Sequence, residues 1–458
     1  MRSWIRAMVV TVAALGTTAS AQAETLADAL IAAYRNSNLL DQNRAVLRAA
    51  DEDVAVAVSA LRPVISYTAS AGWQRTDDAV TPAGRATVEG TSASLSLSAE
   101  LLLLDFGRRQ FGISIARESV LATRQALVQV EQEVLLSAVS AYVDVRLAQD
   151  VVALRQSNLR LITQELRAAQ DRFDVGEITR TDVAIAEARL AASRSALAAA
   201  EGDLMVAREA YKAATGAYPG TLAPLPKAPA LPKTLDEAQA VARNTHPLIR
   251  QAQHLVTIAG LQVDLARAAM KPTLGAGATL EFGDTGEDTA RIGLNLNQTI
   301  YAGGRLSALL RQAISGDDRA RAGLQQTAVN VLESVGVAWA GLLVSNASIE
   351  ASDRQIRAAQ TAFDGVREEA QLGARTTLDV LDAEQELLDA RNARLQAEAQ
   401  RYVVVYQLLS TMGLLTVDHL QLGIPTYDPE AYYKSVERAP SHSAQGKKLD
   451  RILEKIGN

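Results

Sequence analysis

A stretch of 39 residues occurs twice in this chain, and the rest of the organisation follows from it. The first copy reads TLADALIAAYRNSNLLDQNRAVLRAADEDVAVAVSALRP from Thr25 to Pro63, and the second reads TLDEAQAVARNTHPLIRQAQHLVTIAGLQVDLARAAMKP from Thr234 to Pro272. The copies align without a gap at an offset of 209, with eleven identical pairs. A second block, Gly107 to Gly216, aligns with Gly304 to Gly413 at an offset of 197. Copies of about 190 residues are far longer than solenoid repeats, so they predict a duplicated half of one fold.

Each copy predicts a helix, two strands, a very long helix and a returning helix. The first helical segments are interrupted near Asn38 and near Pro247. They end at Pro63 and Pro272, and proline is tolerated only at helix edges.

After each proline the apolar period changes from 3.6 to 2, which is typical of strands. The apolar residues on the predicted faces are Ile65, Tyr67, Ala69, Ala71 and Trp73; Leu95, Leu97, Ala99 and Leu101; Leu274, Ala276, Ala278, Leu280 and Phe282; and Ile292, Leu294 and Leu296. Each strand is about ten residues long, the length that a tilted transmembrane strand needs. Polar loops are expected to join the strands from Arg75 to Gly90 and from Gly283 to Ala290.

The long helices are predicted from Gly107 to Asp174 and from Gly304 to Gln371. About 68 residues at 1.5 Å per residue make a helix of ~100 Å, which a globular domain does not use. Each helix turns at a glycine, Gly176 or Gly373, and returns as a second helix. The charge-free run from Ser334 to Ile349 is shorter than the ~20 residues of a membrane-spanning helix. We interpret it as a helix buried in a bundle.

The predicted organisation has five parts. The first part is predicted to be a signal peptide, because positively charged residues at its start are followed by an apolar run and by the cleavage-site sequence Ala21-Gln22-Ala23. The parts are a signal peptide at 1–23, a first repeat at 24–216, a proline-rich linker at 217–233, a second repeat at 234–426 and a polar tail at 427–458. Within the tail, Leu449, Ile452, Leu453 and Ile456 have helical spacing. A loosely docked tail is the simpler interpretation.

Composition excludes several classes of function. The net charge of −6 disfavours a nucleic-acid partner, because no basic stripe is present to neutralise phosphates. There is no cysteine, so an exported chain must rely on packing or oligomerisation. His246 and His254 have no acid at ligand spacing, and the acids Asp284, Glu287 and Asp288 favour an exposed loop over a calcium site. With no phosphate loop or nucleophile elbow, we predict no enzymatic activity, no catalytic residue, no metal and no cofactor.

Four strands with one apolar face cannot lie in a membrane alone, because their edge groups would face lipid. Bacterial barrels need at least eight strands, so other subunits must complete the barrel, and three copies give twelve. Two alternatives remain open at this stage. One is a soluble sheet edge on a helical stalk, and the other is a periplasmic coiled-coil adaptor. The Ser, Thr, Gly and Asn of the polar face favour a wet lumen.

The chain resembles the TolC-like outer membrane efflux proteins. The motifs that carry the resemblance are Thr25-Leu26, the strand-entry prolines, Leu104-Asp105-Phe106-Gly107-Arg108, Tyr301-Ala302-Gly303-Gly304-Arg305, Val175-Gly176-Glu177-Ile178-Thr179, Leu372-Gly373-Ala374-Arg375-Thr376 and Asp379-Val380-Leu381-Asp382-Ala383. The resemblance implies a homotrimer, with an outer membrane β-barrel continued by a periplasmic α-helical barrel. It also implies export of small molecules or secreted proteins, with a periplasmic adaptor and an inner-membrane ABC or RND-type transporter that supplies the energy.

The candidate site lies at the turns of the long helices. Asp379 and Asp382 are at i, i+3, on one helix face, and resemble the acids that ring the periplasmic entrance of the family. Six such carboxylates would attract cations, and crowding would raise some of their pKa values. Arg375 resembles a residue that bonds neighbouring helices in the closed state, and a solvated turn arginine is the alternative. Adaptor contact is predicted at the turns Gly176, Glu177, Ile178, Thr179 and Gly373, Ala374, Thr376.

The alternative for the acids is helix capping. Thr179-x-x-Asp182 and Thr376-x-x-Asp379 both have the spacing of a capping box at a helix start. Asp382 lies beyond the cap, and the first copy has Ile185 at the matching position. Family members often place an aromatic residue three positions before the turn glycine. Here Phe173 occupies that position in the first copy and Ala370 in the second, so a closed-state lock would be weaker or built differently.

Overall fold

The structure is a computed structural model that describes residues 23–82, 84–283, 288–438 and 451. The predicted signal peptide falls almost entirely outside these residues, as do Asp284, Glu287 and the apolar residues at 449, 452, 453 and 456. The chain divides into two compact units. The turn unit contains the described residues up to Ala33, Ala138–Lys227 and Ala358–Leu395. The strand unit contains Tyr34–Ser137, Ala228–Arg357 and the described residues from Gln396 onward.

The elements follow the predicted order in both copies. The helices are α1 (Leu26–Asn36), α2 (Asn38–Ser59), α3 (Arg108–Asp174), α4 (Arg180–Thr215), α5 (Leu235–Thr245), α6 (Pro247–Ala268), α7 (Arg305–Gln371), α8 (Thr377–Thr411) and α9 (Pro429–Val436). The strands are β1 (Val64–Thr81), β2 (Gly84–Leu104), β3 (Thr273–Gly283) and β4 (Thr289–Asn297). Both α3 and α7 have 67 residues, so the predicted long helices are confirmed. The linker at 217–233 contains neither helix nor strand apart from an isolated bridge between Leu222 and Glu24.

The duplication extends to the register of the hairpins. Val64 pairs with Glu100 in the first hairpin. Adding 209 and 197 to these numbers gives Thr273 and Asn297, which pair in the second hairpin. The other pairs of β3 and β4 are images of β1–β2 pairs under the same offsets. The two copies therefore form the same supersecondary unit twice.

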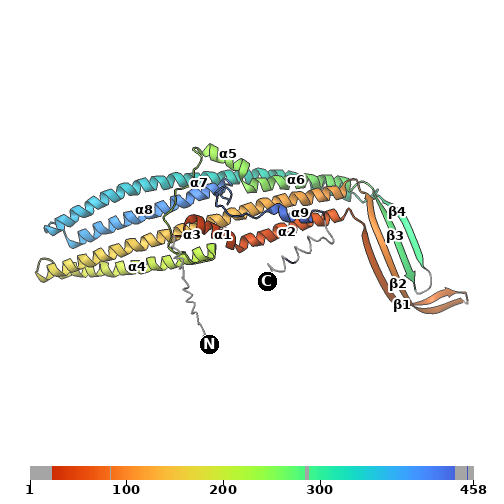
Figure 1. Ribbon diagram of the computed structural model, residues 1–458, viewed down its shortest axis with the longest axis horizontal. Helices are drawn as coiled ribbons and strands as arrows, with labels where there is room; N and C mark the ends of the chain where they lie inside the picture. Colours follow the sequence, from red (N-terminus) through yellow and green to blue (C-terminus); the bar gives the residue numbers. More distant parts are fainter. Residues whose placement is uncertain (1–22, 83, 284–287, 439–450, 452–458) are drawn as a thin grey trace, which may run out of the picture. The chain divides into compact units, whose positions relative to one another are not determined.

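The strand unit contains one antiparallel sheet in the order β1-β2-β3-β4 (Figure 1). Its register brings the predicted apolar residues together on one face: Tyr67 lies opposite Leu97, and Leu97 lies opposite Leu280. The polar face carries direct side-chain bonds, with Ser66 and Ser98 hydroxyls 2.7 Å apart. One face apolar and one face polar is the pattern of a barrel strand between lipid and water.

The first hairpin is longer than predicted. The expected loop from Arg75 to Gly90 is instead paired backbone, with β1 and β2 in register as far as Thr81 and Gly84. Polar cross-strand contacts hold it, including an ion pair of 3.2 Å between Arg75 and Glu89. The prediction of a loop was wrong because residue types that are typical of turns, such as Asp77 and Gly90, lie here within strands that cross-strand pairing holds extended.

The charge-free part of α7 is not buried within one chain. Of its most apolar 18-residue window, only 17% is buried, although its length and composition alone would allow it to cross a membrane. Val337, Leu343 and Val344 are exposed. The interpretation as a helix buried inside the bundle is therefore wrong for the single chain, because the described residues of this chain supply no surface that covers this face.

The start of the tail docks through polar contacts on an apolar base. α9 lies beside α2 in Figure 1, and the Tyr432 hydroxyl donates to Glu52 of α2 at 2.7 Å. The ring of Tyr433 packs against Leu47, Val54 and Val120, and Arg124 lies over that ring at 5.4 Å. The described part of the tail is thus an ordered helix.

Candidate functional site

The two turns that end α3 and α7 have the same backbone. Gly176 and Gly373 have φ of +82° and +79°, in the left-handed region where a Cβ is unfavourable. The amide after each glycine donates to the carbonyl five residues earlier, from Glu177 to Arg172 and from Ala374 to Glu369, both at 2.9 Å. This bond is that of a Schellman cap. Glycine is needed at both turns for this geometry.

The turns present apolar side chains outward. Val175 is 72% exposed, and Leu372, the residue at the matching position of the second copy (its image), is 86% exposed. The predicted contact residues Gly176, Glu177, Thr179, Gly373, Ala374 and Thr376 are also exposed. Ile178 differs, because it packs against a core cluster that includes Ile162 and Leu190. The structure therefore places a small exposed apolar group on each turn, above a packed base.

Both predicted capping boxes are present in the structure. Asp182 accepts from the Thr179 amide at 2.9 Å, and Asp379 accepts from the Thr376 amide at 2.9 Å. Both threonine hydroxyls accept in return from the aspartate amides, at 3.4 and 3.3 Å. These hydrogen bonds favour the charged form and lower the pKa of Asp379 below its ordinary value. In the single chain this is the opposite of the rise that crowding in a ring would cause.

Asp382 has a different environment from Asp379. Its carboxylate lies 2.5 Å from the guanidinium of Arg189 on α4, and both side chains are partly exposed. The image of Asp382 in the first copy, Ile185, packs instead against the core cluster of the turn unit. The predicted pair of acids is thus divided by the structure: Asp379 caps α8, and Asp382 joins α8 to α4.

Arg375 closes its own turn. Its Nε lies 2.8 Å from Glu369, and both side chains are about half exposed. This bond raises the pKa of Arg375 above its ordinary value. Beside it, the carbonyl of Ala370 accepts from Arg172 of α3 at 3.4 Å. Ala370 also lines a cavity of about 110 Å³ with Arg172 and Arg367. The position that holds Phe173 in the first copy is thus occupied by a buried alanine beside a void.

Sequence reasoning missed a buried carboxylate on α8. Glu384 is 3% exposed and accepts from the Asn158 amide of α3 at 2.6 Å. Asn158 in turn accepts from the Ser193 hydroxyl of α4 at 2.9 Å. Burial raises the pKa of Glu384 to about 7, against the effect of the Asn158 bond, while Glu165 raises it and Arg367 lowers it. The sequence carries one indication of this burial. Glu384 has the spacing that places it on the same helix face as the apolar residues Leu381 and Leu388, which are buried.

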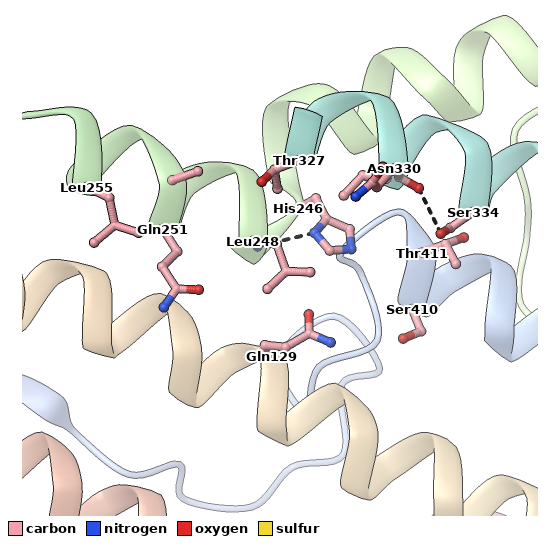
Figure 2. A pocket seen from close by; sticks show the side chains of 12 residues that line it. Gln129, His246, Leu248, Gln251, Leu255, Thr327, Asn330, Ser334, Ser410 and Thr411 are labelled. Carbon is pink, nitrogen blue, oxygen red and sulfur yellow. Dashed lines mark hydrogen bonds between the residues drawn. The ribbon is translucent and has the colours of Figure 1, made fainter. Parts of the chain in front are cut away.

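One cavity in the strand unit is lined by both polar and apolar residues and by no aspartate, glutamate, lysine or arginine. It measures about 420 Å³ and lies among α3, α6, α7 and α8 (Figure 2). His246 lines it and caps α6, with Nδ1 accepting from the Leu248 amide at 3.2 Å. Burial lowers the pKa of His246 to about 4, so its ring is neutral at pH 7. The other candidate ligand, His254, lies 2.8 Å from Glu118, and the described residues contain no group of three metal-ligating side chains.

The chain contains two hairpins that form one sheet with an apolar face, and each hairpin continues into a helix of 67 residues. This combination defines a membrane channel protein with a helical extension. The family model of the outer membrane efflux proteins matches residues 29–217 and 239–414. The chain belongs to this family. The two matched ranges fall in the two copies that the sequence shows.

Similar proteins agree with this assignment. The chain is 38% identical over 427 residues to the outer membrane efflux protein BepC of Brucella suis biovar 1 (strain 1330), covering 91% of each. It is 27% identical to the outer membrane protein TolC of Vibrio cholerae serotype O1, covering 88% of this chain and 94% of that protein. Among solved structures, CusC has a TM-score of 0.75 at 21% identity, covering 84% of this chain and 91% of CusC. OprN has a TM-score of 0.74 at 24% identity, covering 85% of this chain and 89% of OprN. The structural likenesses show the fold.

The protein is thus an outer membrane efflux channel of tripartite efflux or type I secretion systems, with a periplasmic helical extension. Channels of this family are homotrimers that work with adaptors and inner-membrane pumps, and they are transport proteins without enzymatic activity. The resemblance to TolC-like proteins is confirmed. The alternative of a periplasmic adaptor or stalk is excluded by the family and by the two amphipathic hairpins.

Proposed function

We propose that this chain forms a homotrimeric conduit whose two helix turns provide both the periplasmic entrance and the adaptor-binding surface. The observation that carries the proposal is the exposure of Val175 and Leu372 on two turns of the same backbone geometry. Exposed apolar side chains on rigid turns are suited to binding a protein partner. The adaptor would bridge the trimer to an inner-membrane ABC or RND-type transporter, and the conduit itself supplies no energy.

At the entrance we assign different roles to the two predicted acids. Asp379 holds the start of α8 through its capping box. Asp382 supplies the carboxylate of the proposed cation-selective ring, and within one chain its charge is balanced by Arg189. Arg375 holds the second turn through Glu369. The three residues thus act in one region, and only Asp382 contributes the selectivity.

Site-specific crosslinking tests the assignment of the turns. A photoreactive residue at Glu177 or at Ala374 should capture a periplasmic adaptor in cells, because both positions are exposed beside the apolar groups. The matched control is Arg85, which is exposed in the first hairpin. Capture at Arg85 alone would reverse the orientation proposed here. Mass measurement in detergent should give three subunits, and a stable monomer would refute the conduit.

A further inference from the structure

The described end of the tail follows α2 toward the sheet. The Tyr432 hydroxyl of α9 donates to Glu52 of α2 at 2.7 Å (Figure 1). Further along the tail, Arg62, which lies between α2 and β1, donates to the carbonyl of Arg438. Since Glu52 precedes Arg62 on the way to the strands, α9 runs in the same direction as the C-terminal part of α2. It therefore brings Arg438 beside the residues that enter the sheet.

Exposed side chains at this end of the sheet indicate where the membrane surface lies. β1 and β3 begin here and β2 and β4 end here, because the strands are antiparallel. Ile300 and Tyr301, which follow β4, are almost fully exposed. The Lys271 ammonium lies 5.4 Å from the centre of the exposed Phe106 ring. Aromatic and lysine side chains are typical of the interface between lipid headgroups and water, so Arg438 lies near the headgroups of the periplasmic leaflet.

Beyond Arg438 the sequence changes in charge. Residues 439–458 contain four basic side chains and two acidic ones, whereas the whole chain has a net charge of −6. Arg451, the residue of this segment that the structure describes, lies in a helix and is exposed. The large apolar residues of the segment have spacings that place them on one face of such a helix: Leu449, Ile452, Leu453 and Ile456. A helix with one apolar face and a basic polar face is typical of binding to an anionic membrane surface.

We propose that residues 447–456 form a helix that lies on the periplasmic surface of the outer membrane and binds anionic phospholipid headgroups. Its apolar face enters the boundary between headgroups and acyl chains, and Lys448, Arg451 and Lys455 lie toward the phosphate groups. The eight residues from 439 to 446 reach up to ~28 Å when extended, so the helix starts within reach of the headgroups beside Arg438. The inference requires the membrane location of the sheet and does not depend on the roles proposed for the helix turns.

The rival partner for the apolar face of this segment is α2 of the same chain. α2 exposes Val46 and Val56, and its exposed Asp53 would attract basic side chains. Docking there requires the chain to reverse its direction after Arg438, because Arg62 beside it already lies beyond the end of α2. A lipid surface requires no reversal, since it extends outward from the same point, and an anionic one matches the positive charge of the segment. Lipid is therefore the partner that the observations favour.

Fluorescence quenching in the full chain tests this inference, and the absence of cysteine allows a single label. Gly457→Cys carries an environment-sensitive dye directly after the apolar residues. The protein is reconstituted into nanodiscs of phosphatidylcholine, with or without one quarter phosphatidylglycerol. A nitroxide-labelled lipid quenches a dye at the membrane surface, and iodide quenches a dye in water. We expect quenching by the lipid to be several-fold stronger with phosphatidylglycerol, and high salt should weaken it.

Two sets of substitutions in the labelled chain separate charge from other effects. Removing three cations together, by Lys448→Ser, Arg451→Ser and Lys455→Ser, should abolish the preference for phosphatidylglycerol. The matched control removes the two acids of the same segment, by Asp450→Ser and Glu454→Ser. It alters the same helix but raises its positive charge, so quenching by the lipid should increase.

Each other outcome overturns a defined part of the inference. Equal lipid quenching with and without phosphatidylglycerol overturns the recognition of anionic headgroups. A dye that iodide does not reach and the lipid does not quench overturns the membrane location and shows that the segment packs against protein. A dye quenched by iodide alone overturns binding altogether. Subunit mass and adaptor capture are measured separately, so failure here leaves the proposed conduit standing.

Discussion

Asn158 of α3 donates a hydrogen bond of 2.6 Å to Glu384 of α8, joining helices from the two copies across 226 residues of sequence. The second carboxylate oxygen of Glu384 is buried and has no partner in the described structure. Burying a carboxylate costs free energy unless it is neutral or fully bonded. Glu384 is therefore a source of pH dependence in the turn unit, close to the proposed entrance.

The stability of the turn unit should fall as pH rises from about 4.5 to about 7. In this window the unfolded glutamate ionises, while the folded Glu384, whose pKa is raised to about 7, keeps its proton. The unfolded state then binds fewer protons than the folded state, so the free energy of unfolding decreases with pH. Hydrogen exchange of the α8 amides at pH 5, 6, 7 and 8 measures this effect. We expect the protection factors of these amides, which correct for the intrinsic rise of the exchange rate with pH, to fall from pH 5 to about pH 7 and to change little above it.

Matched variants identify the residue responsible. Glu384→Gln should remove the pH dependence, because a neutral amide keeps the bond from Asn158. Glu187 is the image of Glu384 and is exposed, so Glu187→Gln should leave the pH profile unchanged. Equal profiles for wild type and Glu384→Gln would show that this carboxylate is not the titrating group.

The ion pair between Arg189 and Asp382 predicts opposite effects of two substitutions. Asp382→Ala removes the carboxylate of the proposed ring, so trimers in planar bilayers should lose cation selectivity and block by multivalent cations. Arg189→Ala removes the balancing charge, so both properties should increase. The pair itself is partly exposed and contributes only about 0–1 kcal/mol to stability, so both variants should fold.

Asp379→Ala and Asp182→Ala form the control pair for that experiment. Both aspartates occupy capping boxes with the same bonds, so both variants should weaken a turn and leave selectivity unchanged. Loss of selectivity in Asp379→Ala together with normal selectivity in Asp382→Ala would reverse the roles assigned to the two acids.

Local chemistry made much of this fold predictable. Pro63 and Pro272 mark the change from helical to alternating period, and the strands begin at Val64 and Thr273. The spacing of Thr376 and Asp379 is that of a capping box, and the box is present. Each of these signals lies within a few residues, where backbone geometry is determined by near neighbours.

Contacts between distant elements were not predictable in the same way. Arg189 and Asp382 are 193 residues apart, and either residue alone looks like an exposed charge on a helix. Glu384 is buried, whereas Glu187, at the matching position of the first copy, is exposed. Because both positions hold glutamate, the residue type does not reveal which of the two side chains is buried. What decides these cases is how α3, α4 and α8 pack in the turn unit, which depends on the tertiary structure.

A second buried carboxylate makes the docking of α9 sensitive to pH. Asp51 of α2 is fully buried, and neither of its oxygens has a partner in the described structure. It lies on the same helix face as Leu47 and Val54, which support the ring of Tyr433. Burial raises the pKa of Asp51 to about 6, while Arg124 lowers it and Glu52 raises it.

The sign of this effect follows from the raised pKa. Between pH 3.8 and about 6 the unfolded aspartate is ionised and the folded Asp51 stays protonated, so stability falls as pH rises through this range and stays low above it. The protection factors of the α9 amides, which correct for the intrinsic rise of the exchange rate with pH, should therefore be higher at pH 5 than at pH 7. Asp51→Asn should show high protection factors at both pH values, whereas Asp53→Asn, at an exposed neighbouring position, should behave like wild type. Higher protection at pH 7 than at pH 5 in the wild type would show that the charged form of Asp51 is the one that the docked helix favours.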